Sequence, residues 1–254
     1  MSRKSAISWV EAGYVSVRGY AIDELIGRVS FGEAVFLLLR GELPAPAEAA
    51  IFNAILVSVI DHGVSPPSTI AAVTVANTGA GLNSAVAAGL LAINKFHGGA
   101  VEDAMHAIGE ACASGLRADE AAKDLVERYR REGRRVSGFG HRFHAADPRT
   151  VRLFELADEL EIEGKFVAQA KAIESALSEN AARPIPINAD GAIAALLLEL
   201  GFSPKTANGI FMIARTPGLV AHAVEEQERN PPMRTVSVDE YEYDGARGRT
   251  IDEQ

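Results

Sequence analysis

Alanine-rich segments punctuated by glycine and proline most limit how this chain can fold. Alanine occupies 43 of the 254 positions, and aromatic residues make up only 6%. Alanine is the best helix former, whereas aromatic residues favour strands. No group of segments alternates apolar and polar residues with the period of two that half-buried strands require. The sequence therefore predicts an all-α protein without a sheet in its core.

Glycine, proline and capping residues mark the ends of the predicted helices. Ser30 and Glu33 fit a capping box that starts a helix, which Gly41 and Pro44 end. A stretch of small residues over 69–96 lets helices pack closely, with a break at the glycines of 79–81. Further helices are predicted from 22 and over 45–60, 99–114, 118–132, 148–160, 163–179, 191–200 and 207–227, with an extended segment at 14–18 and an irregular tail over 229–254.

The charge balance narrows the classes of function. A formal net charge of −9 argues against a nucleic-acid-binding protein, because such proteins usually carry a basic balance. Seven arginines form a basic island, which suits either a small polyanion or a solvated helix face. The one cysteine, Cys112, excludes an internal disulfide framework and a cysteine-based zinc site. The arginines are Arg128, Arg130, Arg131, Arg134, Arg135, Arg142 and Arg149.

The distribution of apolar residues argues against targeting to a membrane. The first 14 residues lack the apolar core of a signal peptide. The most apolar stretch, over 192–198, is far shorter than the roughly 18 residues that a membrane span needs. We therefore expect a cytoplasmic protein that binds neither membranes nor nucleic acid.

Three of the six histidines lie beside glycine at predicted breaks between helices. These are His62, His97 and His141. Glycine lets a backbone approach a ligand closely, and such loops often carry function. Three histidines in this setting predict a common site.

The remaining histidines and the known sequence motifs do not indicate a second kind of site. His141 and His144 lack carboxylates at ligand spacing, so no metal site is predicted. His106 and His222 have no setting that indicates a role. The absence of a Walker A motif, a Rossmann fingerprint and a nucleophile elbow removes nucleotide hydrolysis, NAD chemistry and serine hydrolysis as easy interpretations.

One carboxylate and one guanidinium stand out beside apolar helices. Asp190 opens an apolar helix, where an N-cap is the commonest role of aspartate. Arg215 interrupts the apolar run Ile-Phe-Met-Ile-Ala. Burial of a guanidinium there is costly unless an anion pairs with it, and either a protein carboxylate or a bound carboxylate would serve.

Several motifs follow one another in an order that is specific in combination. His97-Gly-Gly-Ala is followed by Gly138-Phe-Gly-His-Arg, Asp147-Pro-Arg, Asn188-Ala-Asp and Ala214-Arg. In this order the chain resembles the citrate synthase superfamily, which includes citryl-CoA lyases and the C-terminal module of ATP-citrate lyase. The resemblance covers most of the chain, from Arg18-Gly-Tyr to about position 234.

The resemblance implies a role for each matching residue. His97 would hydrogen-bond the thioester oxygen, and Asp190 would exchange a proton with the acetyl methyl group. His141 would manage the proton at the ketone or hydroxyl oxygen of the C4 acid. Two catalytic groups are needed because a thioester α-carbon is a poor acid, which one base alone cannot ionise. The carboxylates of the C4 acid would be held by His62, Arg149, Arg215 and Arg234, the last from a neighbouring subunit.

The resemblance also implies the fold and the ligands. It implies a citrate synthase-like homodimer in which a smaller mobile domain, 99–190, closes over a large domain formed by 1–98 and 191–254. Coenzyme A would serve as the acyl carrier, and no metal would be required. The residues implied to bind coenzyme A are Val136, Gly138, Phe139, Gly140, Arg142 and Arg183.

Departures from the family pattern favour one direction of the reaction. Synthases carry a His-Glu-Leu-Asn-type stretch where this chain has Asp-His-Gly-Val-Ser-Pro-Pro-Ser over 61–68, and the chain is short for a synthase. Both differences favour cleavage of citryl-CoA, or a close analogue, to acetyl-CoA and oxaloacetate. His97, which replaces the phenylalanine of ATP-citrate lyase modules, keeps citrate or 2-methylcitrate synthase as an alternative. A catalytically silent subunit that binds CoA and citrate is the alternative outside the enzyme class.

Overall fold

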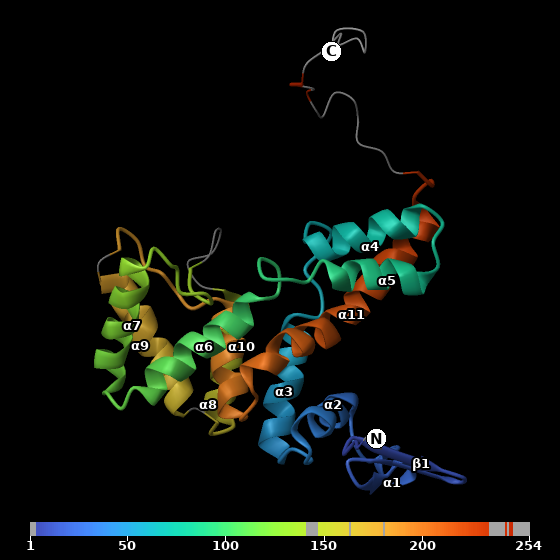
Figure 1. The fold of residues 1–254 in the computed structure, drawn as a ribbon, viewed down its shortest axis with the longest axis horizontal. Helices are drawn as coiled ribbons and strands as arrows, with labels where there is room; N and C mark the ends of the chain where they lie inside the picture. The colour runs from blue at the N-terminus through green and yellow to red at the C-terminus, as the bar shows by residue number, and fades with distance from the viewer. Residues whose placement is uncertain are drawn as a thin grey trace.

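The computed structural model describes residues 4–140, 147–162, 164–179, 181–233, 242 and 244–245. The predicted site residues His141, Arg142 and Arg234 lie outside these residues. The described chain forms three short strands and eleven helices, so the all-α prediction is confirmed for the core (Figure 1). Within the described part, no helix has both the length and the apolar character that crossing a membrane requires.

A small antiparallel sheet lies at the edge of the molecule, near the N-terminus (Figure 1). Its strands are β1 (Ser8–Glu11), β2 (Tyr14–Val17) and β3 (Tyr20–Ala21), in the order β1-β2-β3. Only β2 coincides with a predicted extended segment. Most residues of the sheet are exposed, so it adds little to the core. The short helix α1 (Ile22–Leu25) follows β3 directly.

Helices α2 (Phe31–Arg40) and α3 (Pro46–Ser58) begin the helical body. The predicted capping box is present: Glu33 N–H donates to Ser30 Oγ at 3.3 Å, and Ser30 N–H donates to Glu33 Oε2 at 2.7 Å. Gly41 ends α2 with φ at 95°, in the left-handed region that favours glycine.

Helices α4 (Pro67–Asn77) and α5 (Leu82–Leu91) lie side by side and pack on the long helix α11 (Pro204–Arg229) (Figure 1). The predicted break at the glycines of 79–81 separates α4 from α5. Gly89 allows the close approach, because a Cβ there would lie 2.9 Å from both Ser68 O and a methyl of Leu219. The small-residue stretch therefore packs as the sequence predicts.

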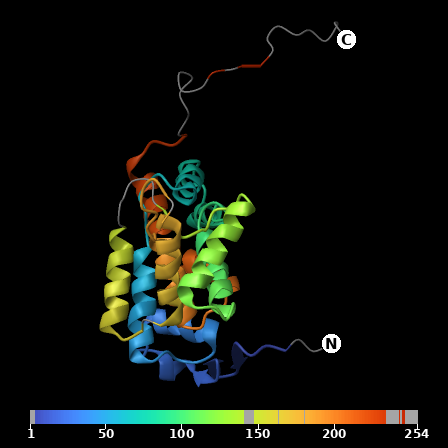
Figure 2. The same ribbon diagram turned by 90° about the vertical axis from the view of Figure 1, so that its left-hand side faces the viewer.

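The remaining helices surround α10 (Ala189–Glu199), most of whose residues are buried. They are α6 (Ala100–Ala113), α7 (Ala118–Arg131), α8 (Pro148–Glu159) and α9 (Lys165–Glu179). Helices α6, α8 and α9 contact α10, and α7 packs on α9. In Figure 2, α3 (blue) stands between α8 (yellow) and the orange and green helices. Helix α10 also contacts α3 and α11, so it links the two ends of the helical body.

Candidate active site

Segments far apart in the sequence meet around a cavity of about 300 Å³. Its lining includes five residues that the sequence predicts to share a site. They come from the loop after α3, the loop before α6, the first turns of α8 and α10, and the middle of α11. These residues are His62, His97, Arg149, Asp190 and Arg215.

Asp190 lies in the first turn of α10 but does not cap it. The cap is Asn188, whose Oδ1 accepts hydrogen bonds from the N–H groups of Asp190 and Gly191 at 3.0 and 3.2 Å. The N-cap alternative for Asp190 is therefore wrong. Burial raises the pKa of the Asp190 carboxyl, and the nearby Arg149 and Arg215 only partly oppose this effect. Asp190 can thus hold a proton at a higher pH than an ordinary aspartate.

Arg149 is oriented by a carboxylate next to it in sequence. Its Nε and Nη2 donate to the two oxygens of Asp147 at 3.0 and 2.8 Å. Asp147 is 2% exposed and also caps α8 by accepting from Arg149 N–H at 3.0 Å. The bidentate pair fixes the plane of the guanidinium at the cavity wall. Sequence reasoning did not give Asp147 a role, although its place before Pro148 is typical of a helix cap.

Arg215 is buried in α11, with 2% of its surface exposed. Its Nε donates to Val59 O at 2.8 Å, and its guanidinium lies 5.0 Å from the ring centroid of Phe211. Its buried Nη1 has no hydrogen-bond partner among the described residues. Burial lowers the pKa of Arg215. A desolvated guanidinium with a free N–H at a cavity wall is suited to a bound carboxylate.

The surroundings of the two described site histidines favour the neutral form of each imidazole. Burial lowers the pKa of both His62 and His97, and the charge of Arg215 adds to this effect. His97 Nε2 lies 2.8 Å from the Oγ of the fully buried Ser68. Sequence reasoning missed Ser68, because the contact spans 29 residues and no local motif marks it.

The glycine turn at 138–140 is fastened to the start of α10. Gly138 O accepts from Asn188 N–H at 3.0 Å, and Asn188 Nδ2 donates to Gly140 O at 3.0 Å. Gly138 has φ at +87°, and a Cβ there would lie 2.8 Å from the Cα of Gly191. The turn and Asp190 are therefore held together as one unit.

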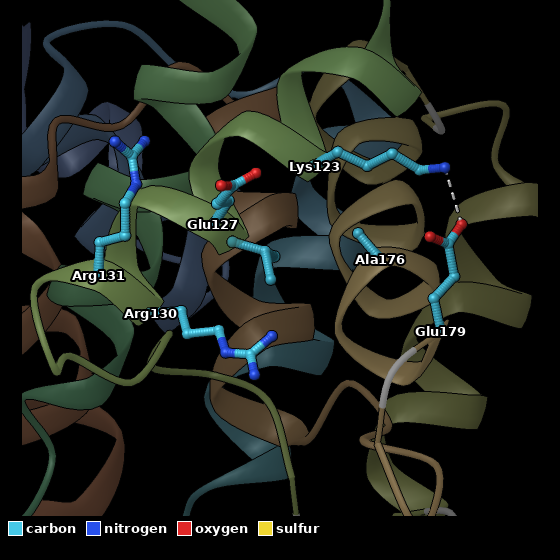
Figure 3. A pocket seen from close by; sticks show the side chains of 7 residues that line it. Lys123, Glu127, Arg130, Arg131, Ala176 and Glu179 are labelled. Carbon is cyan, nitrogen blue, oxygen red and sulfur yellow. Dashed lines mark ion pairs between the residues drawn. The ribbon is translucent and has the colours of Figure 1, made fainter.

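A groove runs beside this turn between α7 and α9, and we call it the α7–α9 groove. One cavity of about 660 Å³ is lined by Arg130, Arg134, Arg135, Val136, Phe139 and Gly140. A second cavity of about 560 Å³ shares Arg130 with it and continues toward Lys123, which pairs with Glu179 at 3.0 Å. In Figure 3, Arg130 extends from α7 toward α9, whereas Arg131 points away from it.

Part of the basic island lines this groove. Arg130, Arg134 and Arg135 line it, whereas Arg128 pairs with Glu110 on α6. Among the predicted CoA residues, Val136, Phe139 and Gly140 line the groove. Gly138 instead faces Gly191 and Ala104. Arg183 is exposed on the segment between α9 and α10. Within the described chain, no three His, Cys, Asp or Glu residues are grouped so that they could hold a metal ion.

Sequence comparison defines the class of the protein. The sequence profile of the C-terminal domain of citrate synthase matches residues 44–236, so the chain belongs to the citrate synthase family. A more specific similarity is to the citryl-CoA lyase of Hydrogenobacter thermophilus, with 40% identity and a TM-score of 0.93. That alignment covers 98% of this chain and 97% of the lyase.

Two further relatives extend the comparison. The citrate synthase of Haloferax volcanii is 31% identical over 78% of this chain, which spans 52% of that protein. The chain thus spans about half the length of this curated relative, and less of several others. The ATP citrate lyase of Methanothrix soehngenii, solved with citrate and coenzyme A, shares the fold with a TM-score of 0.87 at 21% identity, over 100% of this chain and 43% of that one.

Proposed function

We propose that this protein is a citryl-CoA lyase, which cleaves citryl-CoA or a close analogue to acetyl-CoA and oxaloacetate. One observation carries the proposal: Asp190, His97 and two arginines share a cavity. Similarity to a citryl-CoA lyase over nearly the whole chain supports it. Each residue has the chemistry that the reaction needs.

The cleavage is a retro-aldol reaction. A base takes the proton of the tertiary hydroxyl group, and the carbon–carbon bond breaks to leave the ketone of oxaloacetate. The electron pair of that bond moves into the thioester fragment as an enolate. Asp190 gives its proton to the CH₂ carbon and forms the methyl group of acetyl-CoA. We assign the base to His141, so the proton that His141 gains balances the one that Asp190 loses.

His97 stabilises the enolate oxygen in this mechanism. Its lowered pKa keeps the imidazole neutral, so it acts as a hydrogen-bond donor without carrying charge. We assign the donor role in the contact with Ser68 to its Oγ–H group, so that Nε2 of His97 accepts and the proton of His97 lies on Nδ1. A developing oxyanion accepts that proton's hydrogen bond.

The arginines bind the carboxylates of the C4 acid. Arg215 offers an Nη1 that has no hydrogen-bond partner in the described chain, and Arg149 is held in a fixed plane by Asp147. His62 lies at the exposed side of the same cavity. We propose that Arg234 of a second copy completes this set in a cytoplasmic homodimer.

Coenzyme A is proposed to bind in the α7–α9 groove. The groove begins at the glycine turn beside Asp190 and carries Arg130, Arg134 and Arg135, which suit the phosphates of the nucleotide. The residues proposed to contact coenzyme A are Val136, Gly138, Phe139, Gly140, Arg142 and Arg183. Residues 99–190 are proposed to close over 1–98 and 191–254 when the thioester is bound.

Assays in both directions test the function. Purified protein is given citryl-CoA, and oxaloacetate and acetyl-CoA are measured. A parallel assay supplies acetyl-CoA and oxaloacetate and measures free CoA and citrate. We expect cleavage of citryl-CoA. Efficient citrate formation without citryl-CoA cleavage would identify a synthase, and ligand binding without turnover in either direction would identify a silent subunit.

A further inference from the structure

One face of α11 holds the loop that carries His62. Arg215, Gly218 and His222 are spaced by three and four residues, so they lie on the same side of the helix. They meet three consecutive residues, 59–61, directly before His62. The three contacts are a side-chain-to-backbone hydrogen bond, a close backbone approach and a contact between two side chains. Together they position the loop on α11.

The first two contacts fix the backbone of the loop. Arg215 Nε donates to Val59 O at 2.8 Å. At Gly218, a Cβ would lie 2.6 Å from Ile60 O, so only glycine allows the loop to approach this closely. The backbone at Val59 and Ile60 therefore lies directly against α11.

The third contact joins two side chains. His222 Nε2 lies 3.0 Å from Asp61 Oδ1, and the His222 side chain is only 15% exposed. The other carboxylate oxygen of Asp61 accepts from Gly63 N–H at 2.9 Å. Asp61 therefore connects α11 to the backbone on the far side of His62.

The loop at 61–63 is not part of a helix or strand, so regular backbone hydrogen bonds do not hold it. In the described chain, no backbone–backbone hydrogen bond involves the N–H groups of residues 61–65. The contacts of the Asp61 side chain therefore help to place the backbone that carries His62 at the cavity. His222 makes the contact that reaches farthest along the loop.

We propose that His222 is a positioning residue, which donates from Nε2 to Asp61 and thereby orients His62 toward the carboxylates of the bound acid. This proposal rests on the proposed function, because it assumes that His62 contacts the C4 acid. The contact needs a donor at that place but no charge, so a glutamine amide can replace the imidazole. Removal of the donor loosens His62 while the α7–α9 groove is unchanged.

The test compares five variants with the wild type. Binding of citrate, oxaloacetate and CoA is measured by calorimetry, and kcat and KM are measured with citryl-CoA. We expect His222→Ala to weaken binding of the C4 acids by about tenfold, because a hydrogen bond to a charged group is lost. Its CoA binding should match the wild type, and His222→Gln should recover most of the lost affinity.

Three further variants make the result specific. Asp61→Ala changes a partly exposed loop residue, so it provides an answer even if His222→Ala fails to fold. It should show the same loss, and the double variant should lose no more than either single variant. Glu225→Gln is the matched control, because Glu225 lies on the same helix, pairs with Arg229 and should bind all three ligands normally.

The outcomes separate the two proposals. Unchanged acid binding in His222→Ala, failure of glutamine to recover it, or additive losses in the double variant would each overturn the role of His222. If the wild type binds the acids but does not cleave citryl-CoA, a loss in His222→Ala still supports the positioning role while the lyase proposal falls. If the wild type binds neither acid, both proposals fall.

Discussion

The carboxyl group of Asp190 is subject to two opposing influences. Burial favours its neutral form, the guanidiniums of Arg149 and Arg215 favour its charged form, and the net effect is a raised pKa. A lyase gains from this balance, since Asp190 must carry a proton when the carbon–carbon bond breaks. In a synthase, the same residue would have to start as a base.

Asp190→Asn should abolish turnover and stabilise the fold. We expect kcat to fall by about 10³, the typical contribution of a general acid. The pKa of Asp190 is higher in the folded state than in the unfolded state. Its contribution to the free energy of unfolding is therefore fully present below the unfolded-state pKa and is lost as the pH rises through the folded-state pKa. Asparagine removes that loss, so the melting temperature at pH 7 should rise. Thermal unfolding from pH 4 to 8 checks this, and an unchanged kcat would contradict the mechanism.

The pH profile of cleavage should reflect two residues. The pKa of His97 is lowered, so the neutral form persists as the pH falls and is lost only below the ordinary value of 6.5. We expect kcat/KM to fall on the acid side below pH 6.5 and on the basic side as Asp190 ionises. Rates measured across this range, with checks that the protein stays folded, test it. A kcat/KM that stays constant on the basic side would contradict the role of Asp190 as an acid that must carry a proton.

At the scale of elements, the junction of the glycine turn with α10 leaves no room for side chains. A Cβ on Gly191 would lie 2.2 Å from Gly138 O, and neither backbone can move independently. We expect Gly191→Ala to lower the free energy of unfolding by about 1–3 kcal/mol and to weaken CoA binding. Denaturant unfolding and calorimetry measure the two effects.

Gly209→Ala is the matched control for that substitution. Gly209 also lies in a helix, but a Cβ there meets nothing within 4 Å. Alanine should stabilise the protein by up to about 1 kcal/mol, since it is the better helix former. Equal losses in the two variants would show that close packing at Gly191 is not the cause.

Local signals explain which elements could be predicted from the sequence. Ser30, Glu33 and Gly41 act on neighbouring residues, and the helix they delimit was predicted at its observed position. Strand β1 was missed because its residues are exposed on both faces, so no alternation marks it. Motif order predicted the five residues that line one cavity, whereas their roles stay predictions. Ser68 and the Asp61–His222 contact were missed because they depend on partners 29 and 161 residues apart.

At the scale of the whole molecule, the proposed site is shared between two copies. Asp190 would come from one copy and Arg234 from the other. Asp190→Asn and Arg234→Ala should each be nearly inactive as pure proteins. If the two are unfolded together and refolded as a mixture, half the dimers carry one intact site, so activity should return to about a quarter of the wild-type value. A mixture as inactive as its parents would indicate sites built within single copies.

The Nη1 of Arg215, which has no partner among the residues that the structure describes, also has a consequence for the lifetime of the protein in the cell. A buried donor without a partner is a defect in the folded state, and a bound carboxylate repairs it. Citrate or oxaloacetate at 100 times its Kd should therefore raise the free energy of unfolding by about 2.7 kcal/mol. Resistance to protease should increase in parallel, and Arg215→Met should show neither gain. The amount of intact enzyme would then follow the supply of the acids that bind its site, among them the product oxaloacetate, without any dedicated regulator.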